Sequence, residues 1–77
     1  MGISRKDALK RLGGLVPRVV EHFSYITKEP NSLTVPHWRH EISNWLAQME
    51  EVLHALGKKT AAEWRKRIDG WRSQLPE

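Results

Sequence analysis

Six basic side chains follow one another closely near the end of this 77-residue sequence. They are Lys58, Lys59, Arg65, Lys66, Arg67 and Arg72. Phosphate binding requires several lysine or arginine side chains on one accessible surface, where they replace the counterions of the phosphates. On a helical wheel, Arg65 and Arg72 flank one side of the apolar stripe, whereas Arg67 flanks the other. Because the charges are spread around the helix, we expect a solvated surface, with anion or nucleic-acid binding as the alternative.

His37, His40 and Glu41 are spaced at i, i+3 and i+4, so they fall on neighbouring turns of a helix. Imidazole and carboxylate groups placed in this way can bind zinc. His40, however, lies about 60° beyond His37 on the wheel, towards the polar side, and the sequence does not contain the HExxH pattern of zinc enzymes. We therefore predict neither a metal site nor a cofactor.

Arg18 and His22, one helical turn apart, are a further pair with catalytic potential. Some helical ribonucleases use such a pair, in which the arginine holds a phosphate and the histidine moves a proton, but at a wider spacing than the one here. The sequence contains no cysteine, which excludes disulfides, cysteine nucleophiles and thiolate metal sites. A Ser-His-Asp set and a glycine-rich phosphate loop are not recognisable. We therefore expect that the protein is not an enzyme and has no small-molecule substrate.

The elements that would position these residues follow from apolar spacing and from helix start and stop signals. Ser4 predicts the start of a first short helix, because its hydroxyl can accept a backbone N–H and Asp7 follows in the first turn. Gly13 and Gly14 predict its end, since glycine tolerates the left-handed conformation of a helix stop. A second helix begins near Pro17, although its β-branched residues keep a strand as the competing interpretation. Its apolar stripe consists of Val16, Val19, Val20 and Phe23.

Residues 36–56 form the most clearly patterned helix, because eight of their apolar side chains fall within an arc of about 120°. These side chains are Trp38, Ile42, Trp45, Leu46, Met49, Val52, Leu53 and Leu56. Gly57 predicts the end of this helix. Thr60, with a glutamate three residues later, predicts a capping box at the start of a fourth helix over residues 61–75, and Pro76 predicts its end.

The pattern Trp-Arg-x-x-Ile-x-x-Trp occurs twice, at residues 38–45 and 64–71. Its spacing places tryptophan, isoleucine and tryptophan on one helix face. Each tryptophan can bury on the order of 200 Å², so we interpret the pattern as one packing solution used twice, with the tryptophans in the interior. Arg39 and Arg65 lie at the edge of this face, where a guanidinium can stack on an aromatic ring.

These segments predict an all-α fold, a small up-and-down bundle of three to four helices that forms a single domain over residues 1–77. Its base would be an antiparallel helical hairpin of residues 36–56 and 61–75. A chain this short buries only about 60% of its unfolded surface, which leaves no room for a large enclosed active site. No apolar run approaches the ~20 residues that span a bilayer and no signal peptide is recognisable, so we expect a cytoplasmic protein without membrane contact.

The net charge of +4 is unevenly distributed along the sequence. Residues 1–18 carry +4, residues 19–56 carry −3, residues 57–72 carry +4 and Glu77 adds −1. Such a layout is typical either of an anionic partner or of oppositely charged helices that lie side by side.

The most direct interpretation is a non-enzymatic protein-interaction module whose helical surface binds another protein or a second copy of itself. We expect this contact on aromatic surface of residues 36–56 that the shorter neighbouring helices leave uncovered. The alternative is a nucleic-acid-binding accessory protein that uses the lysine and arginine side chains of the first and last helices.

Overall fold

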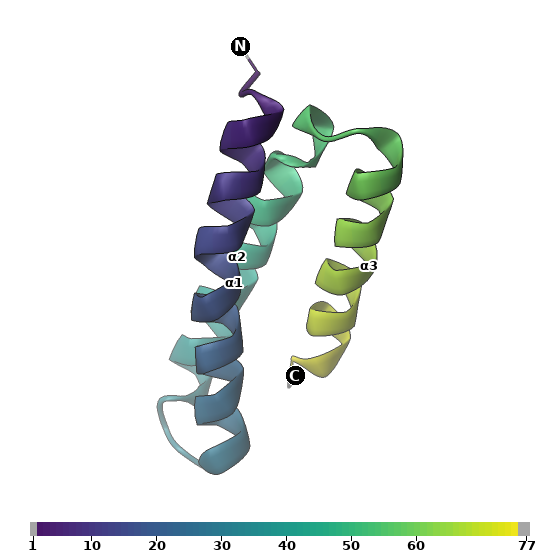
Figure 1. Cartoon of the computed structure of the whole chain (residues 1–77). Helices are drawn as coiled ribbons and strands as arrows, with labels where there is room; N and C mark the ends of the chain where they lie inside the picture. Colours follow the sequence, from purple (N-terminus) through teal and green to yellow (C-terminus); the bar gives the residue numbers. More distant parts are fainter. Residues whose placement is uncertain (1, 76–77) are drawn as a thin grey trace.

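The computed structural model describes residues 2–75, which form three long helices joined by short connections (Figure 1). Their bounds are α1 Arg5–Lys28, α2 Val35–Glu51 and α3 Lys58–Gln74, with a short 3-10 helix, η1 Leu53–Ala55, before α3. The chain runs down α1, up α2 and down α3 in the view of Figure 1, and the described residues contain no strand. This arrangement confirms the predicted all-α, up-and-down bundle. No helix within residues 2–75 combines the length and the apolar character needed to cross a lipid bilayer.

The first two predicted helices form one continuous helix, α1, so the predicted stop at Gly13 and Gly14 is wrong. Ser4 caps α1 as expected, because its Oγ accepts a hydrogen bond from the backbone N–H of Asp7 at 3.1 Å. Neither glycine has a positive φ. The helix continues because a buried apolar stripe extends across the glycine pair. This stripe consists of Ala8, Leu12, Leu15 and Val19.

Pro17 lies inside α1 rather than at the start of a helix. A proline in this place removes one helix hydrogen bond, and its ring crowds the carbonyl group of the residue four positions earlier. That residue is Gly13, and both Gly13 and Pro17 are exposed, away from the buried stripe. Water can therefore bind the carbonyl oxygen that has lost its helix donor, and the helix persists instead of the alternative strand.

The predicted helix over residues 36–56 is divided into α2 and η1. The backbone N–H of Val52 bonds the carbonyl oxygen of Met49 at 3.2 Å, which tightens the turn after Glu51. η1 then leads the chain across the end of the bundle, where it contacts α1, α2 and α3. Val52, Leu53 and Leu56 are buried as the arc predicts. Their burial against three helices compensates for the α-helical hydrogen bonds that a straight continuation would have made.

Gly57 is the N-cap of α3 and follows the end of η1, so it marks a helix start as well as the predicted stop. Its backbone is extended, with φ −64° and ψ 156°, and its carbonyl oxygen accepts a hydrogen bond from the backbone N–H of Ala61 at 2.8 Å. The predicted capping box at Thr60 is therefore wrong, because α3 already begins at Lys58 and Thr60 lies in its first turn. The predicted helix stop at Pro76 lies outside the described residues.

The core is aliphatic, and the repeated pattern contributes its central isoleucines to it. Ile42 and Ile68 are fully buried. The tryptophans on either side are only half-buried, and Trp45, Trp64 and Trp71 pack against the core from its edge. The pattern is thus a packing solution used twice, but its interior residue is isoleucine and its tryptophans cover the rim.

α2 is the central helix of the bundle. It packs most extensively on α1 and less extensively on α3, whereas no Cα atoms of α1 and α3 come within 8 Å of each other. α3 runs back alongside α2, but the hairpin predicted from residues 36–56 and 61–75 is the smaller of the two helix contacts (Figure 1). Within residues 2–75, α1 and α3 are therefore connected through α2 and η1 rather than through direct contact of their backbones.

Candidate functional site

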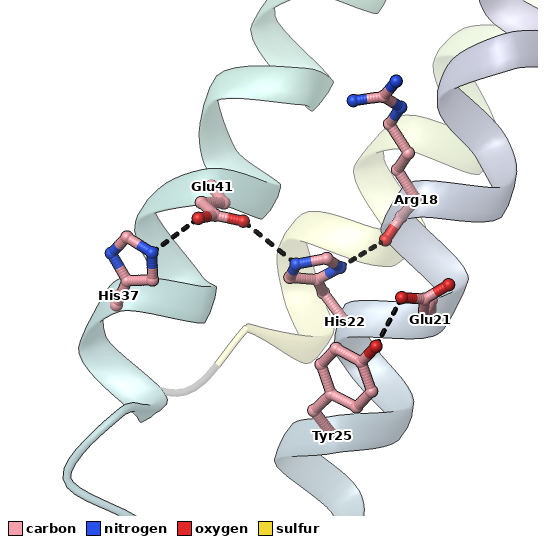
Figure 2. A network of polar contacts seen from close by, with 6 residues as sticks. All are labelled: Arg18, Glu21, His22, Tyr25, His37 and Glu41. Atoms are coloured by element: carbon pink, nitrogen blue, oxygen red, sulfur yellow. Dashed lines mark hydrogen bonds and ion pairs between the residues drawn. The ribbon is translucent and has the colours of Figure 1, made fainter.

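A polar network joins α1 to α2, with the carboxylate of Glu41 at its centre (Figure 2). Oε2 of Glu41 lies 2.9 Å from Nε2 of His22 on α1. Oε1 lies 2.6 Å from Nε2 of His37, one turn earlier on α2. Glu41 therefore links the two helices through His22 and shares its second oxygen with a histidine of its own helix.

The imidazole of His22 is held from several sides. Its Nδ1 lies 2.9 Å from the backbone carbonyl oxygen of Arg18, so both ring nitrogens face oxygen atoms. A doubly protonated ring donates to both of them. The ring also meets Trp45 edge-to-face at 4.7 Å between centroids, and its side chain is only 17% exposed. The side chain of His37, in contrast, is 67% exposed.

Tyr25 extends the network along α1. Its hydroxyl donates a hydrogen bond to Glu21, one turn earlier, and its ring lies against those of His22 and Trp38. The hydrogen bond to Glu21 raises the pKa of Tyr25, and desolvation of the phenol and the negative charge of the carboxylate raise it further. The network thus combines aromatic packing with hydrogen bonds at the interface of α1 and α2.

These positions bear on two of the sequence hypotheses. Within residues 2–75, no cluster of three or more histidine, aspartate or glutamate side chains is arranged to hold a metal ion. His37 and Glu41 lie together, but His40 lines a groove between α2 and α3. The guanidinium of Arg18 is directed away from the imidazole of His22 (Figure 2). A phosphate held by that guanidinium would therefore not face the histidine.

The six basic residues singled out in the sequence all belong to α3 and are exposed. The guanidinium of Arg67 lies over the rings of Trp64 and Trp71, 4.5 and 5.2 Å from their centroids. This is the aromatic contact that was predicted for Arg65. Arg67 makes it because positions i−3 and i+4 share its side of the helix, whereas Arg65 directly follows Trp64 and points about 100° away. Arg39, for which the same contact was predicted, lines the groove between α2 and α3.

Arg72 links α3 to α2 through Glu50. Its Nε donates to Oε1 of Glu50 at 3.0 Å, and its Nη2 contacts the same oxygen. Lys58 and Lys59 begin α3 at the end of the bundle where α1 also begins (Figure 1). The backbones of α1 and α3 do not come within 8 Å of each other, so the basic residues of α3 belong to a helix that packs on α2 and η1 rather than on α1.

A groove of about 610 Å³ lies between the first half of α2 and the end of α3. Its lining consists of Pro36, Arg39, His40, Ser43, Arg72, Ser73 and Leu75. The two arginines come from different helices and are 33 positions apart in the sequence, so no local pattern could have grouped them. Only the folded chain brings them to one site.

An exposed apolar stripe extends along α1, beside the stripe that faces the core. The stripe consists of Leu9, Gly13, Val16, Val20, Phe23 and Thr27, and we call it the α1 stripe. Leu9 is 39% exposed and Val20 is 52% exposed, whereas Val16 and Phe23 are half-buried and also contact the core. The sequence analysis recognised Val16, Val20 and Phe23 as apolar neighbours but missed the continuation to Leu9, because it divided α1 at Gly13, which is a member of the stripe.

No family model matches this chain, and no curated protein or solved structure matches it either. Its function must therefore be argued from the geometry described above.

Proposed function

We propose that this domain is a protein-interaction module that forms a homodimer through the α1 stripe. The observation that carries the proposal is the exposure of Leu9 and Val20 on α1, since these two are the exposed large apolar side chains of the described helices. The sequence analysis expected uncovered surface on the aromatic residues of α2. Instead, Trp45 and Trp38 are covered in part by His22 and Tyr25, and the exposed large apolar side chains of the described helices lie on α1.

The spacing of the α1 stripe favours a second helix as its partner. Successive members are separated by 4, 3, 4, 3 and 4 positions, which is the heptad spacing of helices that pack side by side with interlocking side chains. The stripe is about 27 Å long, at 1.5 Å per residue. Binding of an extended peptide or a small molecule would not require the alternating spacing of 4 and 3 positions. Side-by-side packing of a second helix does require it.

A second copy of the chain matches the α1 stripe in side-chain size when the two α1 helices run antiparallel. In that register Gly13 faces Phe23 of the partner subunit, and Val16 faces Val20 of the partner subunit. Glycine therefore makes room for the largest side chain of the stripe. Each contact occurs twice across the two-fold axis, as is usual in homodimers.

Charge also favours the antiparallel arrangement. Residues 5–11 carry four basic groups and one acid, a net charge of +3, whereas residues 18–29 carry two of each and are neutral. A parallel pair would place two charges of +3 side by side. The antiparallel pair places each basic segment beside a neutral one, which lowers the electrostatic repulsion between the subunits.

Sedimentation equilibrium of the full chain tests the proposal, with Val20→Glu as the disrupting variant. Leu33→Glu is the matched control, because it makes the same kind of exchange in the loop between α1 and α2, where Leu33 is 99% exposed. We expect a concentration-dependent dimer for the wild type and for Leu33→Glu, and a monomer for Val20→Glu. A wild-type chain that stays monomeric at hundreds of micromolar, or equal association of both variants, would contradict the proposal.

Nucleic-acid binding ranks second, because two of the six basic residues of α3 are already engaged. Arg67 stacks on Trp64 and Trp71, and Arg72 pairs with Glu50. If the monomeric Val20→Glu variant bound an oligonucleotide with an affinity that falls steeply with salt, the order of the two functions would be reversed.

A further inference from the structure

We infer that the homodimer binds duplex DNA through a face on which its two α1 helices lie side by side. The inference rests on the proposed homodimer, because a single chain presents only half of this face. The basic residues that form it are Lys6, Lys10 and Lys28 of α1, all of them exposed. Within residues 2–75, none of these three lysines makes an ion pair through its side chain. All three are therefore available to an anionic partner.

The three lysines lie on the side of α1 that faces away from the core. At 100° per residue, Lys10 and Lys28 point in the same direction, nearly opposite the buried stripe, and Lys6 points about 40° closer to the α1 stripe. The α1 stripe itself lies at roughly a right angle to both the buried stripe and the direction of Lys10. A second subunit on the α1 stripe therefore leaves the lysines uncovered.

The symmetry of the dimer brings the lysines of both subunits to one face. When two antiparallel helices pack through the same stripe, the two-fold axis is perpendicular to the plane that contains them. The sides of the two α1 helices that face away from the core therefore point in one direction. In the register that pairs Gly13 with Phe23 of the partner subunit, Lys28 of the partner subunit is level with the turn between Lys6 and Lys10. These three side chains form a lysine cluster at each end of the helix pair.

The distance between the two lysine clusters fits the pitch of a DNA duplex. Their centres are about 20 positions apart along α1, or about 30 Å at 1.5 Å per residue. One turn of B-DNA measures about 34 Å. Lysine side chains are long and flexible, so they can bridge the remaining difference. The two clusters can therefore contact phosphates that lie one turn apart on the same side of the duplex.

The charge between the lysine clusters favours a duplex over an anionic membrane. Glu21 of each subunit lies in this middle part of the face, about 20° from Lys10 on the helical wheel, and its carboxylate accepts the hydrogen bond of Tyr25. A membrane surface carries negative charge everywhere, so the two carboxylates would oppose its approach. The phosphates of a duplex approach the face at the two clusters and leave a groove opposite Glu21.

The lysine clusters also link DNA binding to dimerisation. Three like charges in one cluster repel one another, which weakens the dimer until an anion neutralises them. Binding of phosphates at both clusters removes this repulsion, so DNA and the second subunit each strengthen the binding of the other. Removal of one lysine should therefore weaken DNA binding without weakening the dimer.

Fluorescence anisotropy of a labelled duplex of about 20 base pairs, two turns of B-DNA, tests the inference over a series of salt concentrations. We expect the wild type to bind with an affinity that falls steeply with salt. Lys10→Gln should reduce the slope of log affinity against log salt by about 2, because each dimer loses two phosphate contacts. Lys66→Gln is the matched control, since it removes the same charge from an exposed position of α3, and it should leave the slope unchanged.

Sedimentation of the same samples separates a failure of the inference from a failure of the proposed function. Lys10→Gln should dimerise at least as strongly as the wild type. Val20→Glu should be monomeric and bind the duplex at least about tenfold more weakly than Leu33→Glu, which carries the same added charge but keeps both clusters in one particle.

A wild-type dimer that does not bind the duplex at low salt would overturn the inference and leave the homodimer intact. Equal slopes for Lys10→Gln and Lys66→Gln, equal affinities for Val20→Glu and Leu33→Glu, or binding to phosphatidylserine vesicles in place of the duplex would also overturn it. A monomeric wild type would overturn both the inference and the proposed function.

Discussion

Glu41 is the residue whose side chain connects most groups across the bundle. It contacts His22 on α1 and His37 on its own helix, and His22 in turn contacts the backbone of Arg18 and the ring of Trp45. The sequence analysis grouped His37 with Glu41 correctly, because i, i+4 neighbours are fixed by helix geometry. The contact with His22 could not be predicted, since it depends on how α1 and α2 are aligned.

Glu41→Gln should destabilise the domain by about 1 kcal/mol, because a neutral amide cannot replace a partly buried carboxylate that serves two imidazoles. Glu51→Gln is the matched control, since it removes the same charge from an exposed position of α2. Urea unfolding at neutral pH measures both effects. Equal effects of the two substitutions would show that the Glu41 network contributes nothing beyond its charge.

Because of Tyr25, we expect the free energy of unfolding to change with pH in the alkaline range. Its hydrogen bond to Glu21 raises its pKa in the folded chain, so the folded state holds the phenol proton more tightly than the unfolded state. The associated stabilisation is present below the ordinary tyrosine pKa and is lost as the pH rises through the raised one. Tyr25 is the only tyrosine, so tyrosinate absorbance reports it directly.

Glu21→Gln should lower the midpoint of the Tyr25 titration towards that of free tyrosine, because both the carboxylate acceptor and its charge are removed. Glu51→Gln should leave the midpoint unchanged. A midpoint in the wild type at or below the ordinary value would contradict the hydrogen bond between Tyr25 and Glu21.

Among the helices, α1 shows most clearly which sequence signals were decisive. The apolar spacing of Leu12, Leu15 and Val19 predicts one helix face, and that face is continuous. Gly13, Gly14 and Pro17 are local stop or start signals, and the packing of α1 on α2 outweighs them. Glycine costs a helix only about 1 kcal/mol relative to alanine, which is less than the burial of one leucine provides.

Gly13→Ala and Gly14→Ala should therefore each stabilise the folded monomer, by about 0.5–1 kcal/mol. An added Cβ meets no atom within 4 Å at either position. Their effects on the dimer should differ, because Gly13 belongs to the α1 stripe and Gly14 does not. We expect Gly13→Ala to weaken dimerisation by crowding Phe23 of the partner subunit and Gly14→Ala to leave it unchanged, as measured by sedimentation. A stronger dimer for Gly13→Ala would contradict the proposed register.

For the second half of the chain, the sequence predicted the buried residues more accurately than the helix boundaries. Val52, Leu53 and Leu56 are buried as expected. They do not continue a straight α-helix, however, because Val52 precedes η1, Leu53 begins it and Leu56 follows it. Apolar spacing of three and four residues fits both geometries, so periodicity could not separate them. The start of α3 at Lys58 is set by the extended backbone of Leu56 and Gly57, which leads the chain out of η1.

At the scale of the whole molecule, the bundle is organised around α2. The all-α class and the up-and-down order of the helices follow from helix periods and short connections, and both are confirmed by the structure. Which helix flanks stay open depends on the packing of α1 and α3 on α2. The exposed large apolar side chains of the described helices are Leu9 and Val20 of α1, whereas the sequence analysis expected uncovered aromatic surface on residues 36–56.

The exposure of Leu9 and Val20 leads to the central claim, that a second copy packs on the α1 stripe. The measurement that tests it most directly is an isotope-filtered NOE experiment on a mixture of labelled and unlabelled chains. We predict intermolecular NOEs between the ring protons of Phe23 and the α protons of Gly13. NOEs that join Phe23 to Phe23 of the partner subunit, or intermolecular NOEs confined to other helices, would contradict it.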